Sequence, residues 1–526
     1  MRKRIHKLRI HPAVGIARVG RSPEGFFIGP EIPGVAPAPP RTADAPAGFR
    51  DRKGRLKRQA ARFRVFAYDK SDKLIGEVTG REAKIVWTVH LRNAKAAGRR
   101  FDGLKRRTPP RNPRWRDRRS LVLDPAPAPA RVQGAGARLD LLCFQFMKRA
   151  FQQPLKLGTL RTDAFGRLLV LGGHGHAGTL TDAALDAGEN NYANRDGWYD
   201  DVSDGPVDAV VTLKDGRRLR AMTAWVIVAP PKFAPEVQSV VTLYDTLYQL
   251  ALDSRHLRPE LKKRNLLPRA RASFTDDIYP ILRRAADAQW LFARAGVGHY
   301  HQLSVEQARH DEAYRRHVFR QFRCPDRSTT DTATNATGQM PYLWSDRYPV
   351  DVTQTLTRHQ YDVMKAWADG NFVDDWTARS RRTPTRVSPA GLDRAALEAC
   401  VGAAFVPGIE VSWKVRDVFR YHEPFRLDPV RLRPGDVTQQ MAIPWQSDFV
   451  DCSDGDNPYV WWPSHRPVDV IRASEPLDGP RFVRWARPFS KRDTDDIGIE
   501  AMIQDGDQLG LIKRAGRRLV EYDRRD

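Results

Sequence analysis

The sequence predicts an α+β fold with a β-rich N-terminal half, a helical middle and an irregular C-terminal stretch. Short runs that alternate polar and apolar residues dominate up to about residue 235. Apolar residues at helical spacing follow, and strand-like and loop-like sequence returns after Gly408. Because Pro230-Pro231 separates the first two regions, we expect a β-rich domain at 1–235 and a second domain at 236–526 that carries the chemistry.

Strands are predicted in the N-terminal half, and at 62–68 and 85–91 the prediction rests on partial alternation, which is typical of strands with one buried face. They cover 62–68, 85–91, 167–171, 209–213 and 224–229. The segment 27–48 is rich in Pro, Gly and Ala, so it predicts an extended stretch filled with turns.

The helices of the middle region are predicted from apolar spacing and from capping residues. Ser304 with Gln307 has the spacing of a capping box, and Ser388-Pro389 places proline in a first helical turn. The expected helices cover 240–252, 277–295, 304–322, 356–367 and 388–404.

The formal net charge of +25 and the pI near 10.1 raise the question of nucleic-acid binding. The arginines are spread along the whole chain, and the densest basic run, 99–119, is interrupted by prolines. We therefore expect no nucleic-acid partner and no membrane partner, since no apolar run reaches the roughly 20 residues that cross a bilayer. The basic N-terminus is not followed by the apolar core of a signal peptide, so the expected location is cytoplasmic, or exported by another route.

Cysteine and histidine usage argues against disulfides and metals. No two cysteines form a CxxC pair, and the His174-Gly175-His176 and His299-Tyr300-His301 pairs have no third ligand at a recognisable spacing. We therefore predict no metal site and treat most thiols as reduced. The cysteines are Cys143, Cys324, Cys400 and Cys452.

A loop from Asn190 to Asp204 combines turn formers, acids and aromatic residues. It is either a solvated loop with Asx turns or a functional loop in which Tyr199 walls a small-molecule pocket. The residue pattern leaves both interpretations open.

The most informative segment is 444–452, which ends in Cys452 and is followed by Trp461-Trp462. Asp448 lies four residues before Cys452, and turn-forming residues at 454–458 allow the chain to reverse. A hairpin of this length could place the Cys452 sulfur on the Trp462 indole, with Asp448 ready to accept protons. A thiol, an indole and a carboxylate held together can form a protein-derived quinone.

Several segments of the sequence resemble the LodA-like quinoproteins, the family of lysine ε-oxidase and glycine oxidase. The matching segments are spread over nearly the full length of the chain. They are 10–20, 26–31, 57–65, 197–201, 409–413, 434–436, 444–452 and 461–463.

The resemblance implies a cysteine tryptophylquinone cofactor, made from Cys452 and a tryptophan. It also implies oxidative deamination of a primary amine by O2, giving an aldehyde or oxo-acid, ammonia and hydrogen peroxide. A separate FAD-dependent protein is implied as the partner that matures the cofactor. Asp448 matches the family's acid tied to maturation and catalysis, and Tyr199 matches an aromatic position of the substrate pocket.

The cofactor tryptophan has two candidates. Trp462 is the first because it is close to Cys452 in sequence, and Trp485 is the fallback. The C-terminal segment 502–510 resembles a family segment that carries tryptophan three residues before Leu-Gly, where this chain has Gly506. The alternative is therefore a binding or structural protein that keeps the fold without the quinone. His422 is a candidate for assisting proton transfer; the identity of the amine and any homo-oligomer stay open.

Overall fold

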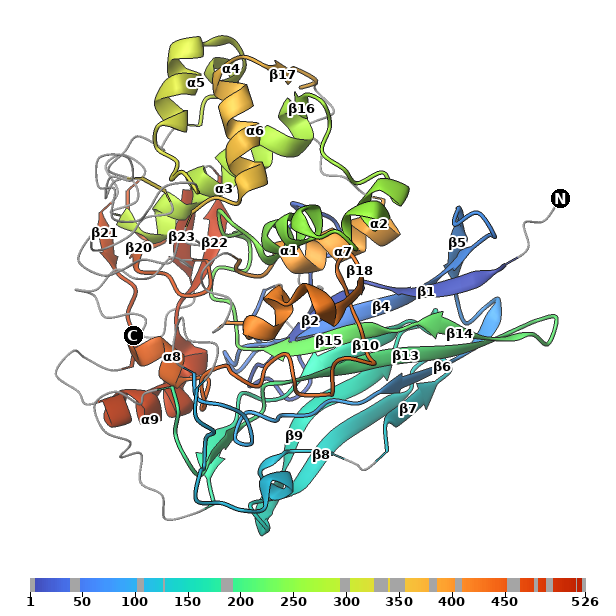
Figure 1. Cartoon of the computed structure of the whole chain (residues 1–526). Coiled ribbons are helices and arrows are strands. Elements are labelled where there is room, and N and C mark those ends of the chain that lie inside the picture. The colour runs from blue at the N-terminus through green and yellow to red at the C-terminus, as the bar shows by residue number, and fades with distance from the viewer. Residues whose placement is uncertain are drawn as a thin grey trace.

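The computed structural model confirms the α+β prediction, with a large mixed sheet covered on one side by helices (Figure 1). It describes residues 5–37, 48–101, 108–125, 128–180, 193–293, 303–325, 339–340, 355–377, 386–402, 409–451, 464–476, 481–488, 495–516 and 518–522. The division into two domains near residue 235 stays a prediction.

The large sheet is built almost wholly from the N-terminal half of the chain. Its pairing order is β1-β14-β13-β15-β2-β4-β10-β9-β8, and the path closes because β1 also pairs with β4. Its strands are β1 (Lys7–His11), β2 (Val14–Arg18), β3 (Phe26–Ile28), β4 (Arg58–Tyr68), β5 (Leu74–Val78), β6 (Ala83–Val89), β7 (Ala130–Gln133), β8 (Arg138–Phe146), β9 (Arg149–Thr162), β10 (Leu168–Gly172), β13 (Ser203–Leu213), β14 (Arg218–Met222) and β15 (Ala224–Ala229).

The strand predictions are confirmed, and the central strands extend beyond them. The stretch predicted at 209–213 is only the end of β13, which begins at Ser203. β15 is apolar and buried at every position, because it pairs with a strand on each side and its alternate side chains pack into two different hydrophobic clusters, one on each face. Strands of this kind read as continuous apolar runs rather than as alternation.

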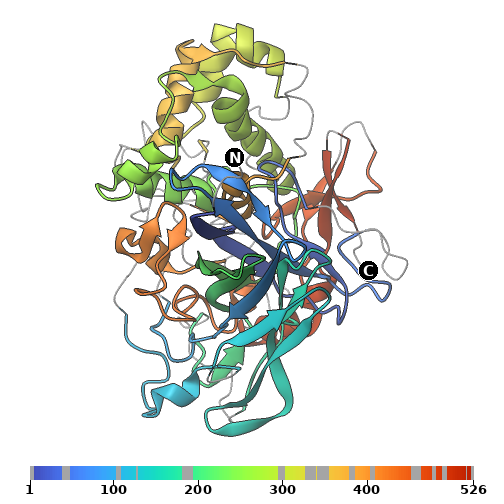
Figure 2. The same ribbon diagram turned by 90° about the vertical axis from the view of Figure 1, so that its right-hand side faces the viewer.

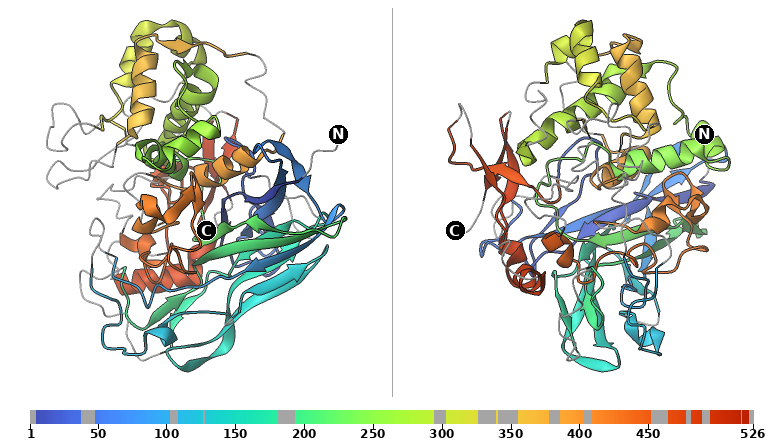
Figure 3. Two further views of the ribbon diagram at one scale, coloured as in Figure 1. Left: turned by 45° about the vertical axis from the view of Figure 1, so that its right-hand side comes forward. Right: turned by 60° about the vertical axis from the view of Figure 1, so that its left-hand side comes forward.

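Small two-stranded sheets lie outside the large one and include two hairpins near the C-terminus, shown in red in Figure 3. The pairs are β11 (Ala177–Thr179) with β12 (Trp198–Asp200), β16 (Ala272–Ser273) with β17 (Phe372–Val373), β18 (Tyr421–Glu423) with β19 (Arg426–Leu427), β20 (Asp469–Ile471) with β21 (Phe482–Arg484), and β22 (Leu511–Ala515) with β23 (Arg518–Tyr522).

The helices form one group above the sheet and a second, smaller group beside it (Figures 1 and 2). None of the helices among the described residues has the length and apolarity needed to span a bilayer. They are α1 (Leu243–Asp253), α2 (Arg258–Lys263), α3 (Tyr279–Ala288), α4 (Val305–His310), α5 (Glu312–Phe319), α6 (Arg358–Ala368), α7 (Pro389–Glu398), α8 (Ser447–Asp451) and α9 (Asp495–Asp505).

Capping side chains set several helix starts. Thr242 and Asp245 form a capping box at α1, and Ser304 accepts a hydrogen bond from the Gln307 amide at α4. The helix predicted over 304–322 is divided in two, because the Asp311 side chain caps a new helix by accepting from the Tyr314 amide. The helices predicted over 277–295 and 388–404 are shorter than expected, because α3 ends at Ala288 and α7 ends at Glu398.

Buried contacts of histidine and arginine side chains with carboxylates fix the C-terminal half onto the sheet. His11 of β1 contacts Asp393 of α7, with 2.8 Å between Nδ1 and Oδ1. Arg18 of β2 donates to Glu410, 2.8 Å from Nη2 to Oε1, and His465 contacts the same carboxylate. Burial alone would raise the pKa of Glu410, but His465 and Arg18 hold it at about 2. The segments before and after the Cys452 motif are therefore anchored to the sheet.

Candidate functional site

The candidate site lies where α8 begins, beside the sheet end that carries Gly172 and next to α9. α8 packs against α9, and both lie at the edge of the sheet in Figure 1. Trp445 and Phe449 belong to the same hydrophobic core as the central strands, and so does Met502 of α9. The site therefore rests on the main core of the protein.

Asp448 lies in α8 and is almost completely buried, with 3% of its surface exposed. Its carboxylate forms an ion pair with Arg466 through Oδ2, and its main-chain carbonyl accepts from Arg466 Nη1 at 2.8 Å. The Arg466 guanidinium also lies over the Phe449 ring, 4.3 Å from its centroid. The predicted acid is thus held in one orientation by one arginine.

Two adjacent acids after Tyr199 organise the approach to α8. The Asp200 carboxylate accepts from the Trp445 amide at 2.9 Å and from Asn93, and forms a buried ion pair with Lys95. The Asp201 carboxylate accepts from the amides of Gly175 and His176, at 2.7 Å and 3.2 Å. These are the donors of a tight turn that follows β10.

The turn and the start of α8 are joined by a side chain. Gln446 Nε2 donates to the Gly175 carbonyl at 3.1 Å, and the Trp445 ring lies 3.7 Å from where a Cβ on Gly175 would be. Gly175 has a positive φ of 78°, which favours glycine. A side chain here would be both strained and crowded, so the glycine of the His174-Gly175-His176 segment serves the turn.

Several buried polar atoms in this neighbourhood have no hydrogen-bond partner among the residues that the structure describes. They are Asp201 Oδ1, Trp445 Nε1, Gln446 Oε1 and His174 Nε2. Burial and then the neighbouring Asp200 raise the pKa of Asp201 from 3.8 to about 7. Burial, with help from Arg58 and Lys156, lowers the pKa of His174 to about 3. The neighbourhood therefore holds a carboxyl that carries a proton in the neutral range and an uncharged imidazole.

Tyr199 lies in β12 and is half-buried. Its ring packs edge-on against Phe146 and Phe151, with centroids 5.6 Å and 4.9 Å away. The same apolar cluster contains Ile499 of α9, so Tyr199 reaches the α9 side of the site. Burial and then Asp201 raise the pKa of Tyr199, which keeps the hydroxyl protonated.

The other predicted site residues fall into two groups. Cys452 and Trp462 lie outside the described residues, so their positions stay predictions. Trp485 is buried beside Phe233, at 5.2 Å between rings, and its Nε1 donates to the Gly510 carbonyl at 3.0 Å. His422 is exposed on β18, and no contact among the described residues joins it to Asp448.

One buried donor in this neighbourhood would suit the quinone that the family resemblance implies at Cys452. The Trp445 indole N–H, which has no acceptor among the described residues, lies immediately before α8, and a quinone carbonyl oxygen would accept a hydrogen bond from a donor of this kind. Position 506, where the resembling family segment carries tryptophan, is occupied by glycine in this chain. A Cβ on Gly506 would lie 2.9 Å from Met502 Cε, so a larger side chain requires that methionine to move.

Sequence reasoning missed Asp200, Asp201, Gln446 and Arg466. The two acids lie in the loop that was already notable for its turn formers and aromatic residues, and a doubled acid after Trp198-Tyr199 was the available signal. Arg466 carried no local signal, because its partner is 18 residues away in sequence.

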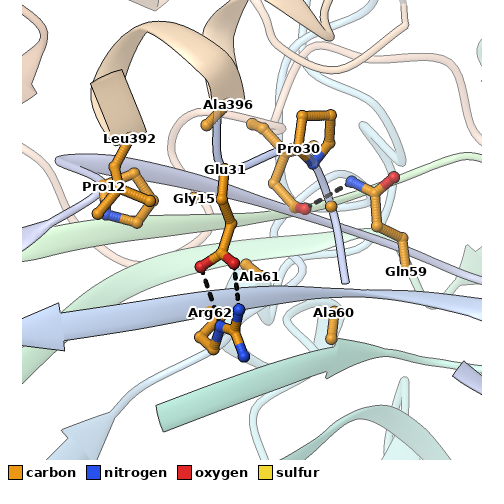
Figure 4. Close-up of a pocket in the computed structure, with 12 residues that line it drawn as sticks. Pro12, Gly15, Pro30, Glu31, Gln59, Ala60, Ala61, Arg62, Leu392 and Ala396 are labelled. Carbon is orange, nitrogen blue, oxygen red and sulfur yellow. Dashed lines mark hydrogen bonds and ion pairs between the residues drawn. The ribbon is translucent and has the colours of Figure 1, made fainter. Parts of the chain in front are cut away.

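Pockets elsewhere among the described residues are not lined by the predicted site residues. The pocket in Figure 4 lies between β2, β4 and α7 and has a volume of about 20 Å³, room for about one water molecule. It is bordered by the Glu31–Arg62 ion pair. A larger cavity of about 430 Å³ lies between α1, α3 and α6. No cluster of three or more metal-ligating side chains occurs among the described residues.

Comparisons with known proteins identify the family and the fold. Residues 11–228 match the family model described as L-lysine epsilon oxidase N-terminal, and residues 335–469 match the L-lysine epsilon oxidase C-terminal domain. The chain is 26% identical to L-lysine 6-oxidase of Marinomonas mediterranea over 542 residues, which covers 85% of this chain and 71% of that protein.

Solved structures show the same fold. A crystal structure of the L-Lys ε-oxidase from Marinomonas mediterranea has a TM-score of 0.75 and 24% identity, covering 98% of this chain and 94% of the other. A structure of the same enzyme described as its Schiff base intermediate with L-Lys gives the same TM-score and identity, with 98% and 95% covered. The two family models and the full-length likeness together establish that this chain belongs to the LodA-like, or L-lysine ε-oxidase, family.

Proposed function

We propose that this protein is a quinoprotein oxidase that deaminates a primary amine with O2, releasing an aldehyde or oxo-acid, ammonia and hydrogen peroxide. The relatives support an amino-acid or amine oxidase. The single observation that carries the finer proposal is the buried Asp448–Arg466 pair at α8, immediately before the cysteine of the motif.

The residues have distinct parts in this proposal. Cys452 and a tryptophan, Trp462 first and Trp485 second, would hold the cysteine tryptophylquinone. Such a quinone supplies an electrophilic carbonyl that accepts two electrons, which no standard side chain provides. Asp448, which is 3% exposed, removes a proton from the substrate carbon as general base.

Tyr199 and its aromatic neighbours wall the substrate side. The ring is fixed by Phe146 and Phe151, and Asp201 lies close enough to affect its pKa. The substrate is an amine of the amino-acid class, as the relative's name suggests. An FAD-dependent maturation protein is the proposed partner, because the quinone requires oxygenation of an indole.

The test is production of the protein together with such a flavoprotein, followed by peroxide detection over a panel of amines and amino acids. Asp448→Asn keeps the size of the side chain but cannot accept the proton, so it should lower kcat by about 10²- to 10⁴-fold. Asp505→Asn, on the last turn of α9, is the matched acid control and should leave kcat unchanged. An Asp448→Asn variant with the kcat of the wild type would contradict the assignment of Asp448 as the general base.

A second candidate function is a binding or structural protein that keeps the fold without the quinone. Gly506 favours it, because the family segment carries tryptophan there and this chain has no indole at that position. The two functions differ in one observable: peroxide release that depends on an amine and on co-production with the flavoprotein.

A further inference from the structure

Arg466 and the predicted base, Asp448, form a buried ion pair. Burying a pair of charged groups is energetically unfavourable. The Arg466 side chain is 1% exposed and that of Asp448 is 4% exposed. Removing two charges from water costs several kcal/mol per ion, and only tight geometry offsets that cost. Replacing such a pair by apolar groups is often neutral or stabilising, so its presence here suggests a role beyond stability.

The geometry restricts Asp448 at more than one point. Arg466 Nη2 pairs with Oδ2, Arg466 Nη1 donates to the Asp448 carbonyl at 2.8 Å, and the guanidinium stacks on Phe449 at 4.3 Å. A single planar group thus fixes the carboxylate, the main chain of α8 and the next side chain. The Asp448 side chain cannot rotate without breaking the ion pair.

The main chain that immediately precedes Arg466 is itself anchored to the segment that follows β15. The His465 carbonyl accepts from the Phe233 amide at 3.2 Å, and the Ser464 carbonyl accepts from the Ala234 amide at 3.0 Å. The His465 ring contacts the buried Glu410 carboxylate, which also binds Arg18 of β2. Arg466 therefore connects α8 to a segment that is itself bonded to the sheet.

We propose that Arg466 is the positioning residue that fixes the Asp448 carboxylate for proton transfer, through its ion pair with Oδ2 and its hydrogen bond to the Asp448 carbonyl. This proposal rests on the proposed function. Arg466 does not touch the substrate; it sets the direction of the group that does. A displacement of about 1 Å at a reacting group costs on the order of 10²-fold in rate, which is the size of the effect expected here.

The test compares Arg466→Lys with Arg426→Lys. Arg426 is a matched control because it is also 1% exposed, pairs with the Glu423 carboxylate at 2.8 Å and donates to two main-chain carbonyls, and it contacts no predicted site residue. Lysine keeps the charge in both variants but cannot make the planar, multiple contact. Thermal unfolding of both variants measures the structural effect that they share.

Two readouts separate positioning from structure. Labelling of Asp448 by a carbodiimide and an amine, followed by peptide mass spectrometry, should rise at least tenfold in Arg466→Lys and stay unchanged in Arg426→Lys. In protein produced with the flavoprotein, kcat should fall about 100-fold in Arg466→Lys with KM within about threefold. Arg466→Ala should regain part of its kcat on addition of guanidinium ions.

The outcomes distinguish the two proposals. Equal labelling of Asp448 in the wild type and in Arg466→Lys would overturn the role of Arg466, whether or not the protein is an oxidase. Increased labelling without peroxide release by the wild type would uphold the positioning of Asp448 and overturn the oxidase. An equal loss of kcat in both lysine variants would also overturn the role of Arg466, because it would reveal a general loss of structure.

Discussion

Asp201→Asn should change how stability depends on pH. The Asp201 side chain is buried, Oδ2 accepts two main-chain N–H groups, and Oδ1 has no partner among the described residues. Asparagine has the same shape and can accept the same two bonds through its oxygen. It differs in that it never carries a charge and has an NH2 group in place of one carboxylate oxygen.

The magnitude follows from the pKa. Burial, and then Asp200, raises the pKa of Asp201 from 3.8 to about 7. An acid with a raised pKa in the folded state stabilises the protein below its unfolded pKa, and this stabilisation is lost as pH rises to the folded value. One pKa unit corresponds to about 1.4 kcal/mol, so the two units between pH 5 and pH 7 correspond to at most about 3 kcal/mol.

The assay is urea unfolding of the wild type and of Asp201→Asn at pH 5 and at pH 8. The free energy of unfolding of the variant, minus that of the wild type, should increase by up to about 3 kcal/mol between these pH values. Taking this difference cancels the histidines, such as His465, whose lowered pKa acts in the opposite direction. Asp204→Asn is a control. Because the pKa of Asp204 is about 6, the difference in unfolding free energy between this variant and the wild type should stop changing near pH 6. A difference that stays constant from pH 5 to pH 8 would refute the reasoning.

Three further substitutions test other parts of the structure. His422→Ala should leave both stability and peroxide release unchanged, since the side chain is exposed; a loss of kcat would restore His422 as a proton-transfer group. Trp485→Phe should lower the free energy of unfolding by about 1–3 kcal/mol, because the buried Gly510 carbonyl loses its donor; an unchanged urea midpoint would contradict this. Glu410→Gln should destabilise by about 3–5 kcal/mol, since Arg18 is left buried without its carboxylate, and calorimetry showing a normal unfolding temperature would exclude that cost.

The fold could be predicted where local signals are strong. The sequence of β15 is a continuous apolar run, and α1 begins at a capping box formed by Thr242 and Asp245. α9 was missed because it has little amphipathic periodicity and contains Gly498, which weakens helix propensity. Its helical state comes from packing against α8 and the aromatic cluster, which no local pattern encodes.

The site could be predicted only in part for a related reason. Asp448 was identified because it lies close in sequence to Cys452, and the structure buries it at the start of the motif. Arg466 and Asp201 act through partners brought near by the fold, so their spacing in sequence carries no periodic signal. The exposed position of His422 likewise follows from where β18 lies, not from its neighbours in sequence.

The most direct test of the central claim is peptide mass spectrometry of the protein produced together with a maturation flavoprotein. The account predicts that the peptide containing Cys452 is covalently joined to a tryptophan peptide with the added oxygen of a quinone, and fragment ions then identify Trp462 or Trp485. A Cys452 that remains a free thiol in the presence of the flavoprotein would contradict the oxidase and leave the second function, a family-fold protein without a quinone.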